Sequence, residues 1–248
     1  MAASAPAPIL WLEEIDSTNA EARRRAEAGA SGPIWIAAER QTAGKGRRGR
    51  AWETGRDNLA ATLLLTTDRP PAEAAQVSFV AALAVADLAR AYLPENLVRL
   101  KWPNDPLVAG RKVSGILIES GRRPDGRLWL ACGIGVNLAT PPDAAERPAT
   151  SFSEHAPGGA PSPSRALEGL AAAFADWLAI WTQQGFPAIA RAWTARAHGL
   201  GEPCTARLGE EGVDGVAEGL DDDGALRLRL PSGQIRRITA GDVFFGGV

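Results

Sequence analysis

The chain has 248 residues, of which 45% are hydrophobic and 23% are charged, and its formal net charge is −2. This composition is typical of a globular protein with a substantial core, built as one large domain or as a medium domain with a small companion. The balanced charge argues against a general polyanion-binding protein, and two cysteines with two histidines are too few for a zinc constellation.

The first third of the chain predicts an alternation of strands and helices. Residues 16–19 open a helix, in which Thr18 and Glu21 have the spacing of a capping box and Gly29 follows the end. A second, long apolar helix is predicted after Pro70-Pro71 and ends near Tyr92. The predicted strands cover residues 9–13, 33–38 and 59–66.

The rest of the chain predicts more strands and one further helical stretch, and the sequence pattern changes to short alternating segments near the end. A strand over residues 97–102 breaks at residues 103–106, and residues 113–119 and 128–138 form an antiparallel pair. Residues 156–164 are a flexible or extended connector, followed by an amphipathic helix whose apolar stripe belongs to the core. From Gly201 onward, short alternating segments predict a small β-barrel of about 45 residues.

The compartment is predicted from what the sequence lacks. The first ten residues have neither the basic nor the apolar region of a signal peptide. The longest apolar stretch, residues 74–85, is shorter than the roughly 20 residues that a bilayer requires. Sparse cysteine suits a reducing compartment. We therefore expect a cytoplasmic protein that does not contact a membrane.

Residues 44–50 concentrate four cations and three glycines in seven positions. Glycines allow backbone N–H groups to approach an anion closely, and arginines add planar forks that match carboxylate or phosphate. The segment is not a Walker A motif, because Lys45 is followed by Gly46, and it does not open the helix that a Rossmann fingerprint requires. A solvated basic turn and an RNA-binding arm are the remaining alternatives.

This loop and its flanks, residues 40–52, resemble the biotin-binding loop of biotin protein ligases. The usual form of that loop is G-R-G-R-R-G-R, so Lys45 departs from it at the second position but keeps the charge. The segment ending in Gly241-Asp242-Val243 resembles the SH3-like module of the same family. Four further segments resemble family motifs in the same order: D-S-T-N at 16–19, K-W-P-N-D at 101–105, K-V-S-G-I-L-I-E at 112–119 and G-I-G-V-N-L at 133–138.

Each short motif also has an ordinary structural explanation. Ser17 or Thr18 fits a helix cap, and Asn104 with Asp105 fits an Asx turn beside two prolines. Lys112 could be a solvated lysine at the edge of a strand. Gly133 and Gly135 fit a β-bulge. The common order of the motifs, over residues 10–246, is what favours the family.

The resemblance implies an α+β fold, with a mixed-sheet catalytic domain of the biotin/lipoate ligase type over residues 1–200 and an SH3-like β domain over residues 201–248. It implies a biotin–[biotin carboxyl carrier protein] ligase that uses ATP and Mg²⁺. Biotin would be joined to AMP and then transferred to a lysine on the carrier domain of a biotin-dependent carboxylase. The resemblance also allows a homodimer.

The resemblance assigns roles to individual residues. The catalytic residues would be Lys112, Arg47 and Asp105, and Asp105 is also the candidate magnesium ligand. Biotin would be bound by Ser17, Thr18, Asn19, Gln41, Gly44, Lys45, Gly46, Arg47, Lys112, Gly115 and Gly133. ATP would be bound by Arg47, Arg48, Arg50, Trp52, Asn104, Lys112 and Asn137.

Two other functions remain as alternatives. A lipoate or octanoate ligase of the same superfamily would not need the D-S-T-N segment, because lipoate has no ureido ring. A nucleic-acid-binding protein would use the basic loop and the β module, but the basic residues do not recur elsewhere among aromatic ones. About ten residues precede the first predicted strand, so we expect an enzyme without a DNA-binding domain, which is not a repressor and does not bind nucleic acid.

Overall fold

A mixed five-stranded sheet forms the centre of the molecule in the computed structural model, which describes residues 7–52, 54–142 and 148–246, apart from the side chain of Arg48. The strand order is β1-β2-β3-β8-β7. β1 and β2 are parallel, and the other neighbours are antiparallel. The strands are β1 Ile9–Ile15, β2 Ile34–Gln41, β3 Leu59–Thr67, β7 Ser114–Arg122 and β8 Leu128–Val136.

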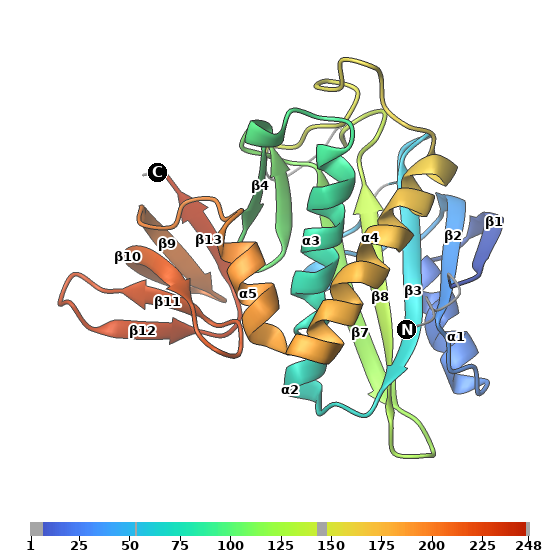
Figure 1. The fold of residues 1–248 in the computed structure, drawn as a ribbon, viewed down its shortest axis with the longest axis horizontal. Coiled ribbons are helices and arrows are strands. Elements are labelled where there is room, and N and C mark those ends of the chain that lie inside the picture. The colour runs from blue at the N-terminus through green and yellow to red at the C-terminus, as the bar shows by residue number, and fades with distance from the viewer. Residues whose placement is uncertain (1–6, 53, 143–147, 247–248) are drawn as a thin grey trace.

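Helices cover both faces of this sheet (Figure 1). Helix α1, Thr18–Glu27, connects the parallel strands β1 and β2 and packs over a small apolar cluster on one face. The main core lies on the other face, under the remaining helices. These are α2 Pro71–Ala74, α3 Val77–Arg90, α4 Pro163–Gln184 and α5 Phe186–Thr194.

The long helix predicted after Pro70-Pro71 is two helices. The first turn, α2, ends at Ala74, and α3 begins at Val77 after a short break at Gln76. The Gln76 side chain accepts a hydrogen bond of 3.0 Å from the indole N–H of Trp181 on α4. The stretch Pro71–Arg90 is long and apolar enough to cross a membrane, yet most of it is buried inside this fold as the central core helix.

The capping-box prediction for Thr18 is wrong by one residue. Ser17 is the N-cap of α1, and its hydroxyl accepts from the backbone N–H of Ala20 at 3.5 Å. The Glu21 carboxylate binds Arg24 and Arg25 on the same helix. Because Ser17 caps the helix, the hydroxyl of Thr18 is available for contacts outside it.

A small three-stranded sheet lies beside the main one, with the order β4-β5-β6. Its strands are β4 Val98–Lys101, β5 Asp105–Val108 and β6 Arg111–Lys112. The predicted break after Trp102 is a tight turn, and the chain returns to a strand at Asp105. The turn therefore places Lys101 and Asp105 directly opposite each other in the antiparallel pair.

The C-terminal region is a five-stranded antiparallel module with the order β12-β11-β10-β9-β13. Leu226 and Leu228 are buried and alternate with arginines, as the sequence pattern predicts. The indole N–H of Trp102 donates a 3.0 Å hydrogen bond to the carbonyl of Gly224 in this module. Its strands are β9 Pro203–Leu208, β10 Glu211–Leu220, β11 Leu226–Arg229, β12 Ile235–Ile238 and β13 Asp242–Phe245.

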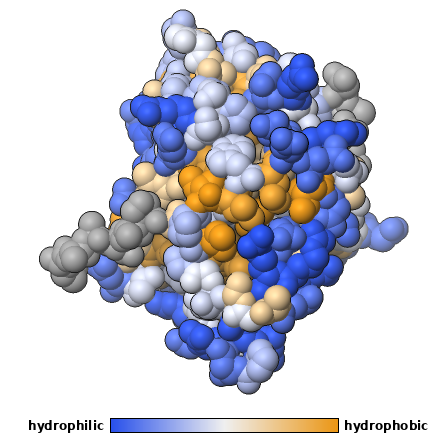
Figure 2. Space-filling model, turned by 90° about the vertical axis from the view of Figure 1, so that its right-hand side faces the viewer, coloured by the Kyte–Doolittle hydropathy of each residue, from blue (hydrophilic) through white to orange (hydrophobic). Residues whose placement is uncertain are grey.

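The α+β class, with a mixed-sheet body and a β module, is confirmed. The division of the chain at residues 200 and 201 stays a prediction. Strand β1 forms one edge of the main sheet, and its Ile9 and Trp11 are the exposed large hydrophobic residues among those described. Figure 2 shows a hydrophobic patch bordered by hydrophilic residues on the side of the molecule where β1 lies.

Candidate active site

A pocket of about 360 Å³ opens between the main sheet, the N-terminus of α1 and the glycine–cation loop, residues 42–52. Its lining comes from residues 17–61 and 105–149, together with Asp242 of the C-terminal module. The lining residues are Ser17, Thr18, Asn19, Gln41, Lys45, Gly46, Arg47, Arg50, Ala51, Trp52, Ala60, Ala61, Asp105, Lys112, Gly115, Ile116, Leu117, Gly133, Ile134, Gly135, Asn137, Pro142, Ala149 and Asp242.

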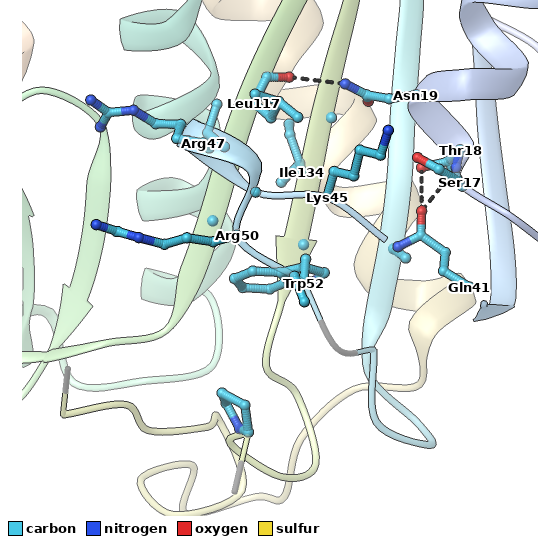
Figure 3. Close-up of a pocket in the computed structure, with 18 of the residues that line it drawn as sticks. Ser17, Thr18, Asn19, Gln41, Lys45, Arg47, Arg50, Trp52, Leu117 and Ile134 are labelled. Atoms are coloured by element: carbon cyan, nitrogen blue, oxygen red, sulfur yellow. Dashed lines mark hydrogen bonds between the residues drawn. The ribbon is translucent and has the colours of Figure 1, made fainter. Parts of the chain in front are cut away.

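One end of the pocket is lined by the uncharged polar side chains of Ser17, Thr18, Asn19 and Gln41. The backbone N–H of Thr18 donates to Gln41 Oε1 at 2.8 Å, and the Thr18 hydroxyl lies 3.1 Å from the same oxygen. Figure 3 shows these contacts and also the amide of Asn19 donating to the carbonyl of Leu117. Ser17, Thr18 and Asn19 are all buried, so their polar groups face the pocket and their protein partners rather than bulk water.

Glycines on β7 and β8 form a flat floor in the middle of the pocket. A Cβ atom on Gly115 or Gly135 would come closer than 3.0 Å to the indole of Trp52. A Cβ atom on Gly133 would collide in the same way with the amide of Asn19. The bulge alternative for Gly133 and Gly135 is wrong, because the pairing of β8 with both neighbours runs through these positions without a shift.

The other end of the pocket is charged. Asp105 is almost fully buried, and its two oxygens each bind a lysine: Lys101 at 2.8 Å, and Lys112. Burial alone would raise the pKa of Asp105, but the charges and hydrogen bonds of Lys112 and Lys101 hold it well below its usual range. Asp105 is therefore a carboxylate that holds the ammonium group of Lys112 at the pocket wall.

The glycine–cation loop contacts the C-terminal module. Arg47 donates to the carbonyl of Gly241 at 3.0 Å and to Asn104 Oδ1 at 3.3 Å. The carboxylate of Asp242 lies 3.8 Å from Arg47 and 3.7 Å from Arg50. In Figure 3, Arg47 and Arg50 extend to the same side, and Lys45 extends in the opposite direction. The charged end of the pocket is thus shared between the loop and the β module.

The pocket brings together most of the residues that the sequence singled out. Gly44 lies behind the lining, where its carbonyl accepts from the backbone N–H of Trp52 at 2.9 Å. Asn104 is buried beside Arg47 and donates to the carbonyl of Ile116. The side chain of Arg48 lies outside the described part of the structure. The individual roles in binding and catalysis stay predictions.

Several lining residues were not predicted as site residues from the sequence. Asp242 contributes a carboxylate, although Gly241-Asp242-Val243 had been noted only as a family-like segment. Apolar strand residues such as Ala60, Ile116 and Ile134 also line the pocket, and alternation in the sequence cannot tell which face of a strand lines a cavity.

The residues that the structure describes do not form a protein-built magnesium site. Within residues 7–52, 54–142 and 148–246, no three histidine, cysteine, aspartate or glutamate side chains cluster as metal ligands. Asp105 already binds an ammonium group with each oxygen. Its role as a magnesium ligand stays a prediction that these surroundings do not favour.

Comparison with known proteins agrees with this geometry. The family model described as the biotin/lipoate A/B protein ligase family matches residues 11–137, and the model of the biotin protein ligase C-terminal domain matches residues 199–246. A biotin–[acetyl-CoA-carboxylase] ligase of Paracoccus denitrificans is 48% identical over 243 residues, which are 95% of this chain and 100% of that protein.

Two solved structures of biotin protein ligases in complex with ligands have the same fold. A biotin protein ligase from Aquifex aeolicus in complex with biotin and ATP has a TM-score of 0.78 and 27% identity, and the match covers 96% of this chain and 97% of that one. A biotin protein ligase from Leishmania major in complex with biotinyl-5-AMP has a TM-score of 0.66 and 25% identity, covering 94% and 99%.

The fold and the pocket together define a ligase of the biotin/lipoate type, with a neutral polar end and a cationic end joined by a glycine floor. The family matches and the Paracoccus relative narrow this class. The chain belongs to the biotin protein ligases of the biotin/lipoate A/B protein ligase family.

Proposed function

We propose that this protein attaches biotin to a lysine on the biotin carboxyl carrier domain of an acetyl-CoA carboxylase or a related carboxylase. The observation that carries the proposal is the polarity of the pocket. Its neutral end suits the ureido ring of biotin, its glycine floor suits the bicyclic body, and its cationic end suits a carboxylate beside phosphates.

The first step joins biotin to ATP. An oxygen of the biotin carboxylate attacks the α-phosphorus, the bond from this phosphorus to the bridging oxygen breaks, and pyrophosphate leaves with the electron pair. Two unit charges of the same sign at 4 Å repel by about 4 kcal/mol at an effective dielectric constant near 20. Lys112, Arg47 and Arg50 would offset this repulsion and stabilise the charge that develops on the phosphoryl oxygens.

The second step transfers the acyl group. The neutral amine of the carrier lysine attacks the acyl carbon of biotinyl-AMP, AMP leaves with the electron pair, and the nitrogen loses a proton to form the amide. Lys112 would again lie beside the leaving phosphate, held there by Asp105. Magnesium would enter as MgATP, as part of the substrate.

We propose the cytoplasm as the compartment of the reaction, as the sequence predicts. Cys132 and Cys204 are both free and buried, which is consistent with a reducing compartment. Burial raises the pKa of the Cys132 thiol far above its usual value, so this thiol is not a nucleophile of the reaction.

The proposal is tested with the purified protein, MgATP, biotin and a carrier domain. We expect pyrophosphate release that depends on biotin, and a mass increase of the carrier by one biotinyl group. A carrier with arginine in place of the acceptor lysine is the control, and it should stay unmodified. Modification with lipoate or octanoate but not with biotin would instead establish the alternative ligase.

A further inference from the structure

The neutral end of the pocket is supported by two residues that do not line it, Thr62 and Glu119. Thr62 lies on β3 with none of its surface exposed, and its hydroxyl lies 2.8 Å from Thr18 Oγ1 and 2.7 Å from Asn19 Oδ1. Glu119 on β7 accepts a 2.7 Å hydrogen bond from Asn19 Nδ2. These contacts decide which hydrogen atoms the pocket can offer.

The orientation of the Asn19 amide follows from Glu119. A carboxylate only accepts hydrogen bonds, so the amide atom beside it is the nitrogen and the amide oxygen faces Thr62. The second hydrogen of the same nitrogen points to the carbonyl of Leu117 at 3.4 Å. Both donor positions of Asn19 are therefore used within the protein.

The single proton of the Thr62 hydroxyl is assigned in the same way. The amide oxygen of Asn19 can only accept, so Thr62 donates to it. Thr62 then has no proton left for Thr18. The Thr18 hydroxyl must give its own proton to Thr62 or to Gln41 Oε1, which lies 3.1 Å away. In both cases the Thr18 oxygen presents only lone pairs to a ligand.

We propose that Thr62 and Glu119 are positioning residues that make Thr18 and Asn19 acceptors only, so that the pocket selects a ligand by its N–H donors. This inference rests on the proposed function and specifies how the site recognises its substrate. A ureido ring has two N–H groups and can satisfy these acceptors. A dithiolane ring or an ether oxygen has none, and the buried acceptors would be left unsatisfied.

The test compares biotin with the two oxazolidinone analogues of biotin, in each of which a ring oxygen replaces one ureido N–H. Affinities are measured by titration calorimetry. The wild type should prefer biotin over the analogue that lacks the N–H facing Thr18 and Asn19 by roughly 100-fold or more, because a buried acceptor loses its donor. Thr62→Val removes the hydroxyl beside Thr18 and lets the Thr18 hydroxyl turn to donate to a ring oxygen, so this preference should narrow by about 10-fold.

Matched variants separate this role from a general effect on the fold. Thr62→Ser keeps the hydroxyl and should keep the wild-type preference. Thr66→Val makes the same substitution four residues further along β3, on the same face of the sheet, and should also keep it. Glu119 is only partly buried, so Glu119→Ala should fold and should narrow the preference, while Glu119→Gln keeps an acceptor and should restore it.

Failure of the inference and failure of the proposed function give different binding results. If Thr62→Val and Glu119→Ala weaken biotin and both analogues by the same factor, the two residues are purely structural and the inference is wrong. A Thr62→Val protein that keeps the wild-type preference also overturns it. If the wild type binds no biotin at all, the proposed function fails together with the inference.

Discussion

Lys112 and Asp105 are the pair of residues on which the proposed chemistry depends most directly. Lys112 lies on the short strand β6, at the edge of the small sheet, as a solvated edge lysine also would. Its ammonium group, however, binds a buried carboxylate at the wall of the pocket. This contact holds the ammonium group where it can lie beside a phosphate.

Replacing Lys112 by alanine should reduce biotin-dependent pyrophosphate release by about 100- to 1,000-fold, the usual cost of removing one charge-stabilising group. The protein should stay folded, because Lys101 still pairs with Asp105. Arg111→Ala is the control, since Arg111 is the neighbouring residue on β6 and binds Glu154 instead. Near wild-type pyrophosphate release in Lys112→Ala would remove Lys112 from the mechanism.

The lowered pKa of Asp105 predicts how stability depends on pH. A carboxyl group whose pKa is lower in the folded state stabilises the fold above its ordinary pKa of 3.8, and this stabilisation is lost as the pH falls toward the folded-state value. Lys112→Met removes one cause of the lowered pKa. The difference in Tm between wild type and Lys112→Met should therefore be constant above about pH 5 and shrink below pH 4.

Thermal unfolding followed by circular dichroism from pH 3 to pH 7 measures this difference. Arg111→Met serves as the matched control, because Arg111 does not contact Asp105. A Tm difference between wild type and Lys112→Met that grows as the pH falls would contradict the assignment of the lowered pKa to the Asp105–Lys112 pair.

At the scale of elements, the glycine–cation loop, residues 42–52, is the segment most dependent on long-range partners. Within the loop, backbone hydrogen bonds join Gly46 to Arg50 at 2.7 Å and Trp52 to Gly44 at 2.9 Å. Its arginines contact a carbonyl and a carboxylate of the C-terminal module. Mutual repulsion among the cations opposes this arrangement until a ligand with carboxylate or phosphate groups neutralises them.

Trypsin should therefore cleave residues 42–52 readily in the free protein, and biotinyl-AMP should protect them. Mass spectrometry of the fragments locates the cleavage sites. The exposed hairpin between β7 and β8, which contains Arg127, is an internal control that the ligand should not protect. Equal cleavage of the loop with and without bound ligand would mean that the loop does not close on it.

At the scale of the whole molecule, the body and the C-terminal module share one continuous hydrophobic core. Trp102 binds the module through Gly224 on one side, and Arg47 binds it through Gly241 on the other. The charged end of the pocket is thus complete only when both parts are folded together, because Asp242 comes from the module. A homodimer stays a prediction.

The net charge of −2 predicts that the basic loop does not serve a nucleic acid. A site that neutralises four phosphates should give log K falling with log salt at a slope of about −3 to −4. We expect duplex DNA to bind no better than roughly millimolar in 150 mM salt, because local cations attract polyanions only weakly against this net charge. Biotinyl-AMP should bind far more tightly and displace any DNA from the loop.

Fluorescence anisotropy measures the affinity for labelled duplex DNA and for labelled single-stranded RNA. Each titration is made with and without biotinyl-AMP. Micromolar binding at 150 mM salt that biotinyl-AMP does not reduce would support the nucleic-acid-binding alternative.

The sequence by itself determined most of the elements and the family. Period-two alternation identified the C-terminal strands, and turn residues located the hairpin between β7 and β8. The motifs from Asp16 to Asn137 named most residues of the pocket, because each motif is a short segment whose chemistry is visible in consecutive residues. These features depend on neighbours in the chain, so one sequence is enough to read them.

Only the tertiary structure decided how these segments support one another. Helix propensity favoured one long helix after Pro71, whereas the packing of Trp181 against Gln76 accompanies a break there. The carboxylate of Asp242 contacts Arg47, which lies far earlier in the chain. Thr62 binds Asn19, from which it is separated by 43 residues. Such contacts depend on which faces of distant elements are buried together, and no local pattern of residues encodes that pairing.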